Sequence, residues 1–138
     1  MERKTFYTIQ QLKGITGLRM ESGYELEIVG RKFYGYMSAD QTIYIIDPKN
    51  GCAIASRCYD FVDYDESTAK EVIEDEMRCI KNVAKYVVDQ GIIERLKKKE
   101  KKKSYQLTIK AFNAFVKAET LLKKQKVEEL KEYCEGEE

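Results

Sequence analysis

The chain has 138 residues, with 25 lysine and arginine residues against 24 aspartate and glutamate residues, and a net charge of +1. Hydrophobic residues make up 43% and charged residues 36%, which is typical of an ionic globular domain with one core. Histidine is absent, so the usual general base and the usual partner of a serine or cysteine nucleophile are missing. No stretch approaches the ~20 apolar residues that span a bilayer, and we expect a cytoplasmic protein without membrane attachment.

The first segment, residues 8–18, has the sequence TIQQLKGITGL. Thr8 can cap a helix, two apolar residues follow at helical spacing, and Gly14 can end it. We therefore predict a short N-terminal helix that ends near Lys13. The run resembles the first helix and turn of helix-turn-helix repressors, and this resemblance implies a DNA-binding role. Residues 19–25 lack the apolar spacing of the recognition helix that would follow.

Apolar and polar residues then alternate in short runs, which is typical of half-buried strands. The predicted strands are residues 24–28, 32–37, 42–46 and 52–59. Residues 47–51, Asp-Pro-Lys-Asn-Gly, combine a proline with residues that tolerate positive φ, and they are the clearest turn signal. Because the connections are short, we predict a four-stranded antiparallel meander over about residues 24–63.

Helical periodicity follows the predicted sheet. Thr68 and Glu71 match a capping box, and apolar residues then recur at a spacing of 3.6. We predict a long amphipathic helix over about residues 68–89, which ends before Gly91 and covers one face of the sheet.

A second long helix is predicted over about residues 105–132. A basic connector, residues 94–103, joins the two helices, and an acidic tail, residues 135–138, is expected to be disordered. The expected fold is a single α+β domain over residues 1–138. It is a four-stranded antiparallel meander packed against one long amphipathic helix, plus a short N-terminal helix and a second long C-terminal helix. The second helix has more apolar side chains than a small sheet can cover, so we also predict a homodimer.

Charges of opposite sign are segregated in this chain. An acidic block between Asp60 and Glu76 contains one lysine, whereas a basic block between Arg95 and Lys103 contains one glutamate. The cations of the basic block are Arg95, Lys97, Lys98, Lys99, Lys101, Lys102 and Lys103. Three interpretations are open for them: a solvated helix face, contacts with the phosphates of DNA or RNA, or docking on an acidic protein surface.

Tyrosines and acids near the sheet form a second candidate surface. One face of the meander must pack on the helix, and the other can expose tyrosines to a partner. The residues assigned to this partner-binding surface are Tyr34, Tyr36, Tyr44, Tyr59, Asp60, Asp63, Asp65 and Glu66. The alternative is that these tyrosines pair across strands and help to cover the second helix.

These features favour a non-enzymatic protein that binds and regulates a macromolecular partner. In style it is similar to phage or mobile-element accessory proteins that inhibit a host nuclease or defence complex. A protein partner is the first hypothesis, and nucleic-acid binding through residues 95–103 is the alternative. A second alternative is an enzyme that uses the acidic cluster 60–66 with a divalent metal. We expect no cofactor and four reduced cysteines, because glycine-rich phosphate motifs and closely paired cysteines are both missing.

Overall fold

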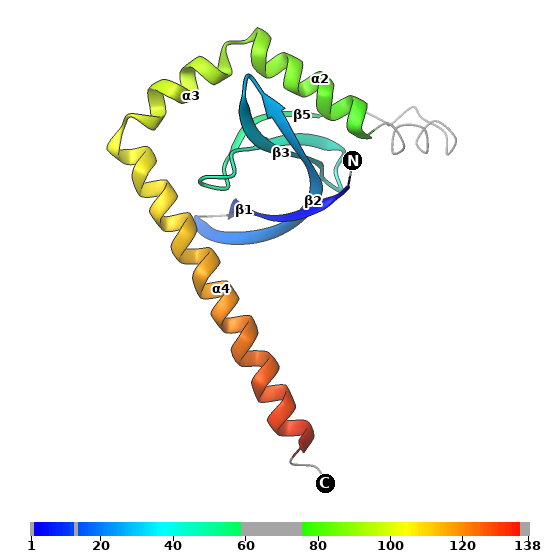
Figure 1. Ribbon diagram of the computed structural model, residues 1–138, viewed down its shortest axis with the longest axis vertical. Coiled ribbons are helices and arrows are strands. Elements are labelled where there is room, and N and C mark those ends of the chain that lie inside the picture. Colours follow the sequence, from blue (N-terminus) through cyan, green and yellow to red (C-terminus); the bar gives the residue numbers. More distant parts are fainter. Residues whose placement is uncertain (1, 13, 59–75, 136–138) are drawn as a thin grey trace, which may run out of the picture.

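The computed structural model describes residues 2–12, 14–58 and 76–135. It places a five-stranded antiparallel sheet, in the order β1-β2-β3-β4-β5, beside three described helices (Figure 1). The strands are β1 (Lys4–Leu12), β2 (Ile15–Ile28), β3 (Arg31–Met37), β4 (Thr42–Ile46) and β5 (Ala53–Cys58), and the helices are α2 (Glu76–Asp89), α3 (Ile92–Glu100) and α4 (Lys103–Glu135). The predicted α+β class is confirmed, but the sheet has five strands rather than four.

The N-terminal segment is a β-hairpin, so the predicted short helix is wrong. β1 pairs along its whole length with the first part of β2. Gly14, which the sequence pattern predicts as a helix stop, lies between the two strands with a φ of +80°. Threonine and isoleucine favour strands, and the period of two in β1 buries Phe6 and Thr8 on one side. The resemblance to helix-turn-helix repressors therefore does not extend to the fold.

One face of the sheet packs on α2, as predicted. Phe33 of β3 and Ile43 of β4 are completely buried in the same cluster as Ile80 and Val83 of α2. α2 ends at Asp89, where the sequence predicts its end, and its predicted beginning lies outside the described residues. Gly91 has a φ of +65° and turns the chain into α3, which continues the helical layer (Figure 1).

The other face of the sheet is covered by the sheet itself. β2 is long and bends near Gly23, so that its first part pairs with β1 and its last part pairs with β3. The bend curls β1 over this second face (Figure 1), where Phe6 packs against Tyr36. The backbone N–H of Ile9 donates a hydrogen bond of 2.8 Å to the carbonyl oxygen of Gly51. β1 therefore reaches the turn between β4 and β5.

α4 is the longest described element, and its C-terminal part projects away from the sheet (Figure 1). Its beginning is held by the β4–β5 turn, where Nδ2 of Asn50 donates to Oγ1 of Thr108 at 3.2 Å. Further along, Nζ of Lys123 donates to the hydroxyl of Tyr7 at 3.2 Å. The helix predicted over residues 105–132 is confirmed with slightly wider limits. Among the described helices, none combines the length and the apolar character needed to cross a membrane.

Candidate functional site

The basic segment 94–103 is mostly helical, and the predicted connector is α3 together with the beginning of α4. Ile93 and Leu96 are buried against the core, and these two residues fix which side of α3 faces the sheet. Lysine is a good helix former, so a lysine-rich segment can continue the helix. The signal for α3 was present in the sequence, because apolar residues at helical spacing precede and enter the lysine run.

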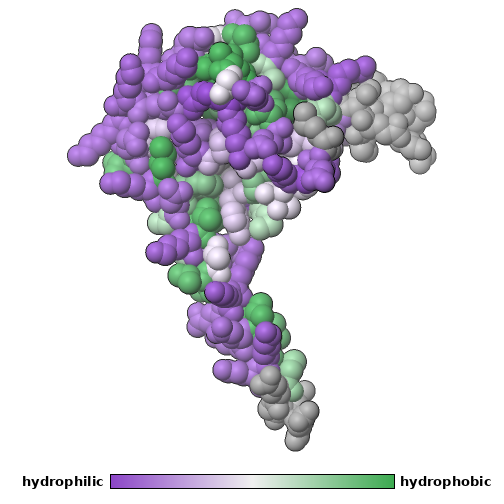
Figure 2. Space-filling model, viewed as in Figure 1, coloured by the Kyte–Doolittle hydropathy of each residue, from purple (hydrophilic) through white to green (hydrophobic). Residues whose placement is uncertain are grey.

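α3 and the residues that join it to α4 direct their cations to solvent. All seven cations assigned to nucleic-acid binding are exposed: Arg95, Lys97, Lys98, Lys99, Lys101, Lys102 and Lys103. Three of them, Arg95, Lys98 and Lys99, follow the spacing i, i+3, i+4 and so lie on one side of α3, and Lys102 follows in the bend between α3 and α4. We call these four residues the basic ridge. Figure 2 shows the region of α3 as mainly hydrophilic.

The acid inside this segment, Glu100, points away from the basic ridge. Its Oε1 accepts a hydrogen bond from Nη2 of Arg31 and lies 3.5 Å from Nζ of Lys49. Burial alone would raise the pKa of Glu100, but the hydrogen bond from Arg31 and the two nearby positive charges lower it overall. Glu100 therefore stays ionised, and its carboxylate pairs with Arg31 on the sheet side of α3.

The cations of the basic segment form no ion pair with another residue in the described part of the chain. No described carboxylate lies within ion-pair distance of any of the seven. Lys102 follows the last turn of α3, and its backbone N–H donates to the carbonyl oxygen of Lys99 at 3.0 Å. The basic ridge thus lies on α3 and the bend after it, and the buried side chains of Ile93 and Leu96 anchor α3 to the core.

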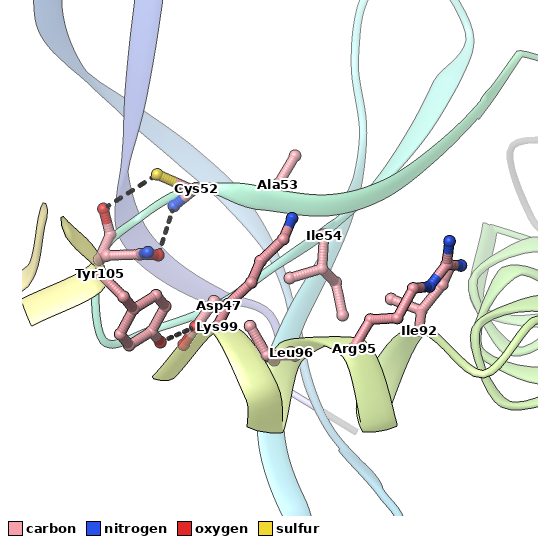
Figure 3. Close-up of a pocket in the computed structure, with 10 residues that line it drawn as sticks. Asp47, Cys52, Ala53, Ile54, Ile92, Arg95, Leu96, Lys99 and Tyr105 are labelled. Atoms are coloured by element: carbon pink, nitrogen blue, oxygen red, sulfur yellow. Dashed lines mark hydrogen bonds between the residues drawn. The ribbon is translucent and has the colours of Figure 1, made fainter. Parts of the chain in front are cut away.

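A cavity of about 290 Å³ lies beside the basic ridge, between α3 and the β4–β5 turn (Figure 3). Arg95 and Lys99 are one helical turn apart and both line it, with Leu96 between them. Ile54 adds a further apolar side chain to the lining. The cavity therefore combines an apolar wall with two cations.

Asp47, at the inner end of this cavity, has a structural role. Its carboxylate accepts hydrogen bonds from the hydroxyl of Tyr105 and, at 3.0 Å, from the backbone N–H of Lys49. Burial and the bond to Asp47 raise the pKa of the Tyr105 hydroxyl, which favours its role as a donor. A buried carboxylate disfavours an anion inside the cavity, so a phosphate would meet Arg95 and Lys99 from the solvent side.

The tyrosine surface is only partly open, and Tyr36 pairs with Tyr44 across neighbouring strands. Tyr36 is 7% exposed, and Tyr34 and Tyr44 are half-buried. The ring of Phe6 stacks on Tyr34 with centroids 4.5 Å apart, and Tyr36 stacks on Tyr44 at 5.3 Å. Burial, followed by the Glu21 carboxylate, raises the pKa of Tyr36 to about 12. The physical reason is β1, because the segment predicted as a helix is the strand that covers this face.

A trough of about 530 Å³ remains on this face, and sequence reasoning missed it. Tyr36 and Tyr44 line it together with residues 8–10 of β1, and Arg19 lies at its edge. The trough forms between β1 and the strands that β1 covers, so it depends on the curvature of the sheet. No local sequence pattern predicts that curvature. The other residues of the predicted partner-binding surface, Tyr59, Asp60, Asp63, Asp65 and Glu66, lie outside the described residues. Their assignment to a partner, and that of cluster 60–66 to a metal, stays a prediction.

No protein-family model, no curated protein and no solved structure matches this chain. Function must therefore be inferred from geometry and charge. Cys52, Cys58, Cys79 and Cys134 form no disulfide in the described part of the chain. Among the described surfaces, the basic ridge has the most definite chemistry, since three of its four cations share one side of α3 and a buried apolar pair orients that helix.

Proposed function

We propose that this protein binds nucleic acid through the phosphate backbone and that the basic ridge is its contact surface. The observation that carries the proposal is the orientation of Glu100 toward Arg31, which leaves the ridge cations facing solvent without a described counter-charge. Exposed cations that are not locally neutralised attract a polyanion and release its counterions on binding.

The size of the ridge fits a run of phosphates. A helix rises about 1.5 Å per residue, so the step from Arg95 to Lys99 covers about 6 Å along α3, and Lys102 extends the ridge beyond the end of that helix. A DNA duplex carries one negative charge per about 1.7 Å, so about three to four phosphate charges lie along that length. Several ridge lysines can therefore contact phosphates at the same time.

The chemistry of the ridge favours binding without sequence preference. Three of its four residues are lysines, which act as point charges, whereas bidentate reading of a base is the property of arginine. The guanidinium of Arg95 is partly occupied, since its Nη2 donates to the carbonyl oxygen of Gln90 at 3.1 Å. We therefore expect the ridge to contact phosphates rather than base edges.

The other hypotheses receive less support from the geometry. Regulation of a protein partner, including inhibition of a host nuclease or defence complex, depended on an open tyrosine face and on residues 59–66. Tyr36 is buried, and that segment lies outside the described residues. A metal-dependent enzyme depended on the acidic residues of the same segment. Both hypotheses stay predictions from the sequence.

Salt dependence of binding tests the proposal. We expect the fluorescence anisotropy of a labelled DNA duplex to report binding at low salt, with equal affinity for duplexes of different sequence. Contacts with about four to six phosphates predict a slope between about −3 and −6 for log affinity against log salt.

The control ligand is poly-glutamate, which carries negative charges without the charge density of a duplex. Equal affinity for poly-glutamate would contradict the proposal and would instead support docking on an acidic protein surface. Duplex binding that is absent at low salt, or that does not weaken as salt rises, would also contradict it.

A further inference from the structure

The cavity beside the basic ridge has an apolar body and a charged entrance. Ile54 of β5 and Ile92 and Leu96 of α3 supply its apolar lining (Figure 3). Arg95 and Lys99 also line it, and both are exposed, so they mark its solvent side. Its volume of about 290 Å³ lies at the lower end of the range of ~300–1,000 Å³ that is typical of small-ligand sites. The cavity therefore suits a single ring system rather than a peptide or a large cofactor.

The inner end of the cavity offers hydrogen-bond acceptors. Tyr105 and Asp47 are buried there, and the tyrosine hydroxyl donates its hydrogen bond to the carboxylate. A carboxylate has about four lone-pair sites, and the described hydrogen bonds use two of those on Asp47. The hydroxyl oxygen of Tyr105 can also accept a hydrogen bond. The structure therefore favours an occupant with an N–H or O–H donor at its inner end, which an alkyl chain lacks.

The two ends of the cavity together restrict the chemistry of the occupant. A negative group must stay at the entrance near Arg95 and Lys99, because the buried carboxylate of Asp47 disfavours a negative charge inside. The body must be apolar on its faces and end in a hydrogen-bond donor. A nucleotide meets these conditions, since its base has apolar faces and its phosphate is held outside the ring by the sugar. In a duplex the donor edge of the base is already paired, so only an unpaired base can enter.

We propose that this cavity binds one unpaired base of a single-stranded nucleic acid whose neighbouring phosphates contact Arg95 and Lys99. The inference deepens the proposed function and rests on it, since the basic ridge supplies the phosphate contacts. The ridge gives affinity for any strand through charge, and the cavity adds a preference for strands whose bases are free. Because the walls are aliphatic rather than aromatic, we expect one base to add about fivefold in affinity, at the lower end of the effects of stacked bases.

Two single strands of equal charge test whether a base is bound. A short deoxycytidine strand should bind about fivefold more tightly than an abasic strand of the same length, because only the first carries bases. Both strands should show the same salt slope in fluorescence anisotropy, because their phosphates are the same. Equal affinity of the two strands, with salt dependence retained, would overturn the base site and leave the phosphate contacts of the ridge standing. Binding of neither strand at low salt would contradict the proposed function itself.

The same substitution at two cysteines tests where the base is bound. Cys52 is half-buried and lines the cavity, whereas Cys58 is exposed at the end of β5 and does not line it. Cys52→Phe should remove the preference for the deoxycytidine strand and leave the affinity for the abasic strand unchanged. The control, Cys58→Phe, should keep the preference. A preference that survives in both variants would overturn the assignment to this cavity.

The natural thiol of Cys52 gives a second measurement that needs no substitution. Burial raises the pKa of this thiol, so its alkylation by iodoacetamide is followed in alkaline buffer, by mass spectrometry of the peptide that contains it. The deoxycytidine strand should largely protect Cys52, whereas the abasic strand at equal saturation should leave its alkylation rate unchanged. Equal rates with the two strands would overturn the proposal even if Cys52→Phe failed to fold.

Discussion

Replacement of Gly23 by alanine is expected to lower the free energy of unfolding by about 3 kcal/mol or more. A Cβ atom at this position would lie 2.2 Å from the carbonyl oxygen of Gly35 and 2.7 Å from Cβ of Tyr36. Neither atom is the end of a flexible side chain, so the backbone of two strands would have to move. Gly23 lies where β2 passes from pairing with β1 to pairing with β3, so this is also the point where the sheet curls.

The matched control for this variant is Gly17→Ala on the same strand. A Cβ atom at Gly17 meets nothing within 4 Å, and its φ is not positive, so the control should keep nearly the stability of the natural chain. Urea unfolding followed by circular dichroism measures both variants. Equal stability of the two would mean that β2 does not bend tightly at Gly23.

A variant that combines Lys98→Gln, Lys99→Gln and Lys102→Gln is expected to lose about tenfold or more in affinity for a DNA duplex at low salt. Each lost phosphate contact lowers the salt slope by about one, so the slope should become shallower by about three. All three lysines are exposed and have no described ion-pair partner, so the fold should not change. Fluorescence anisotropy over a range of salt concentrations measures affinity and slope together.

The control for the ridge variant combines Lys124→Gln, Lys126→Gln and Lys131→Gln. These lysines are exposed on the C-terminal half of α4, and their replacement removes the same amount of positive charge. If net charge alone attracted the duplex, the two variants would lose affinity equally. We instead expect the control to keep most of the affinity and the natural slope, because the ridge is the contact surface.

Much of the fold was predictable where local sequence signals agree with each other. β4 has the limits predicted for it, and the turn after it forms as expected. Gly51 has a φ of +69°, and its N–H donates to the carbonyl oxygen of Asp47 at 2.9 Å. Here the β-branched run and the Pro-Lys-Asn-Gly sequence point to the same structure.

The first hairpin was not predictable in the same way. Residues 8–12 carry apolar residues at a spacing that also suits a helix. A short apolar run does not distinguish the 3.6-residue period of a helix from the two-residue period of a strand. The segment is a strand because all nine residues of β1 pair with the first part of β2. The wrong helix also left open whether the tyrosine face is exposed, because β1 is the strand that covers it.

The cations of the candidate site were predictable from charge alone, but their arrangement was not. The decisive contact joins Glu100 to Arg31, which are 69 residues apart in the chain. Only the packing of Ile93 and Leu96 on the core determines that Glu100 faces inward and the ridge faces outward. A charge pattern therefore predicts which residues bear the charge, whereas the fold determines which of them remain available to a partner.

The most direct test of the basic ridge as the contact surface is to map amide chemical shifts by nuclear magnetic resonance while a short DNA duplex is added at low salt. We predict that the largest shifts fall between Arg95 and Lys103 and that they reverse when salt is raised. Shifts that leave this segment unchanged and gather instead around the trough of Tyr36 and Tyr44 would contradict the assignment.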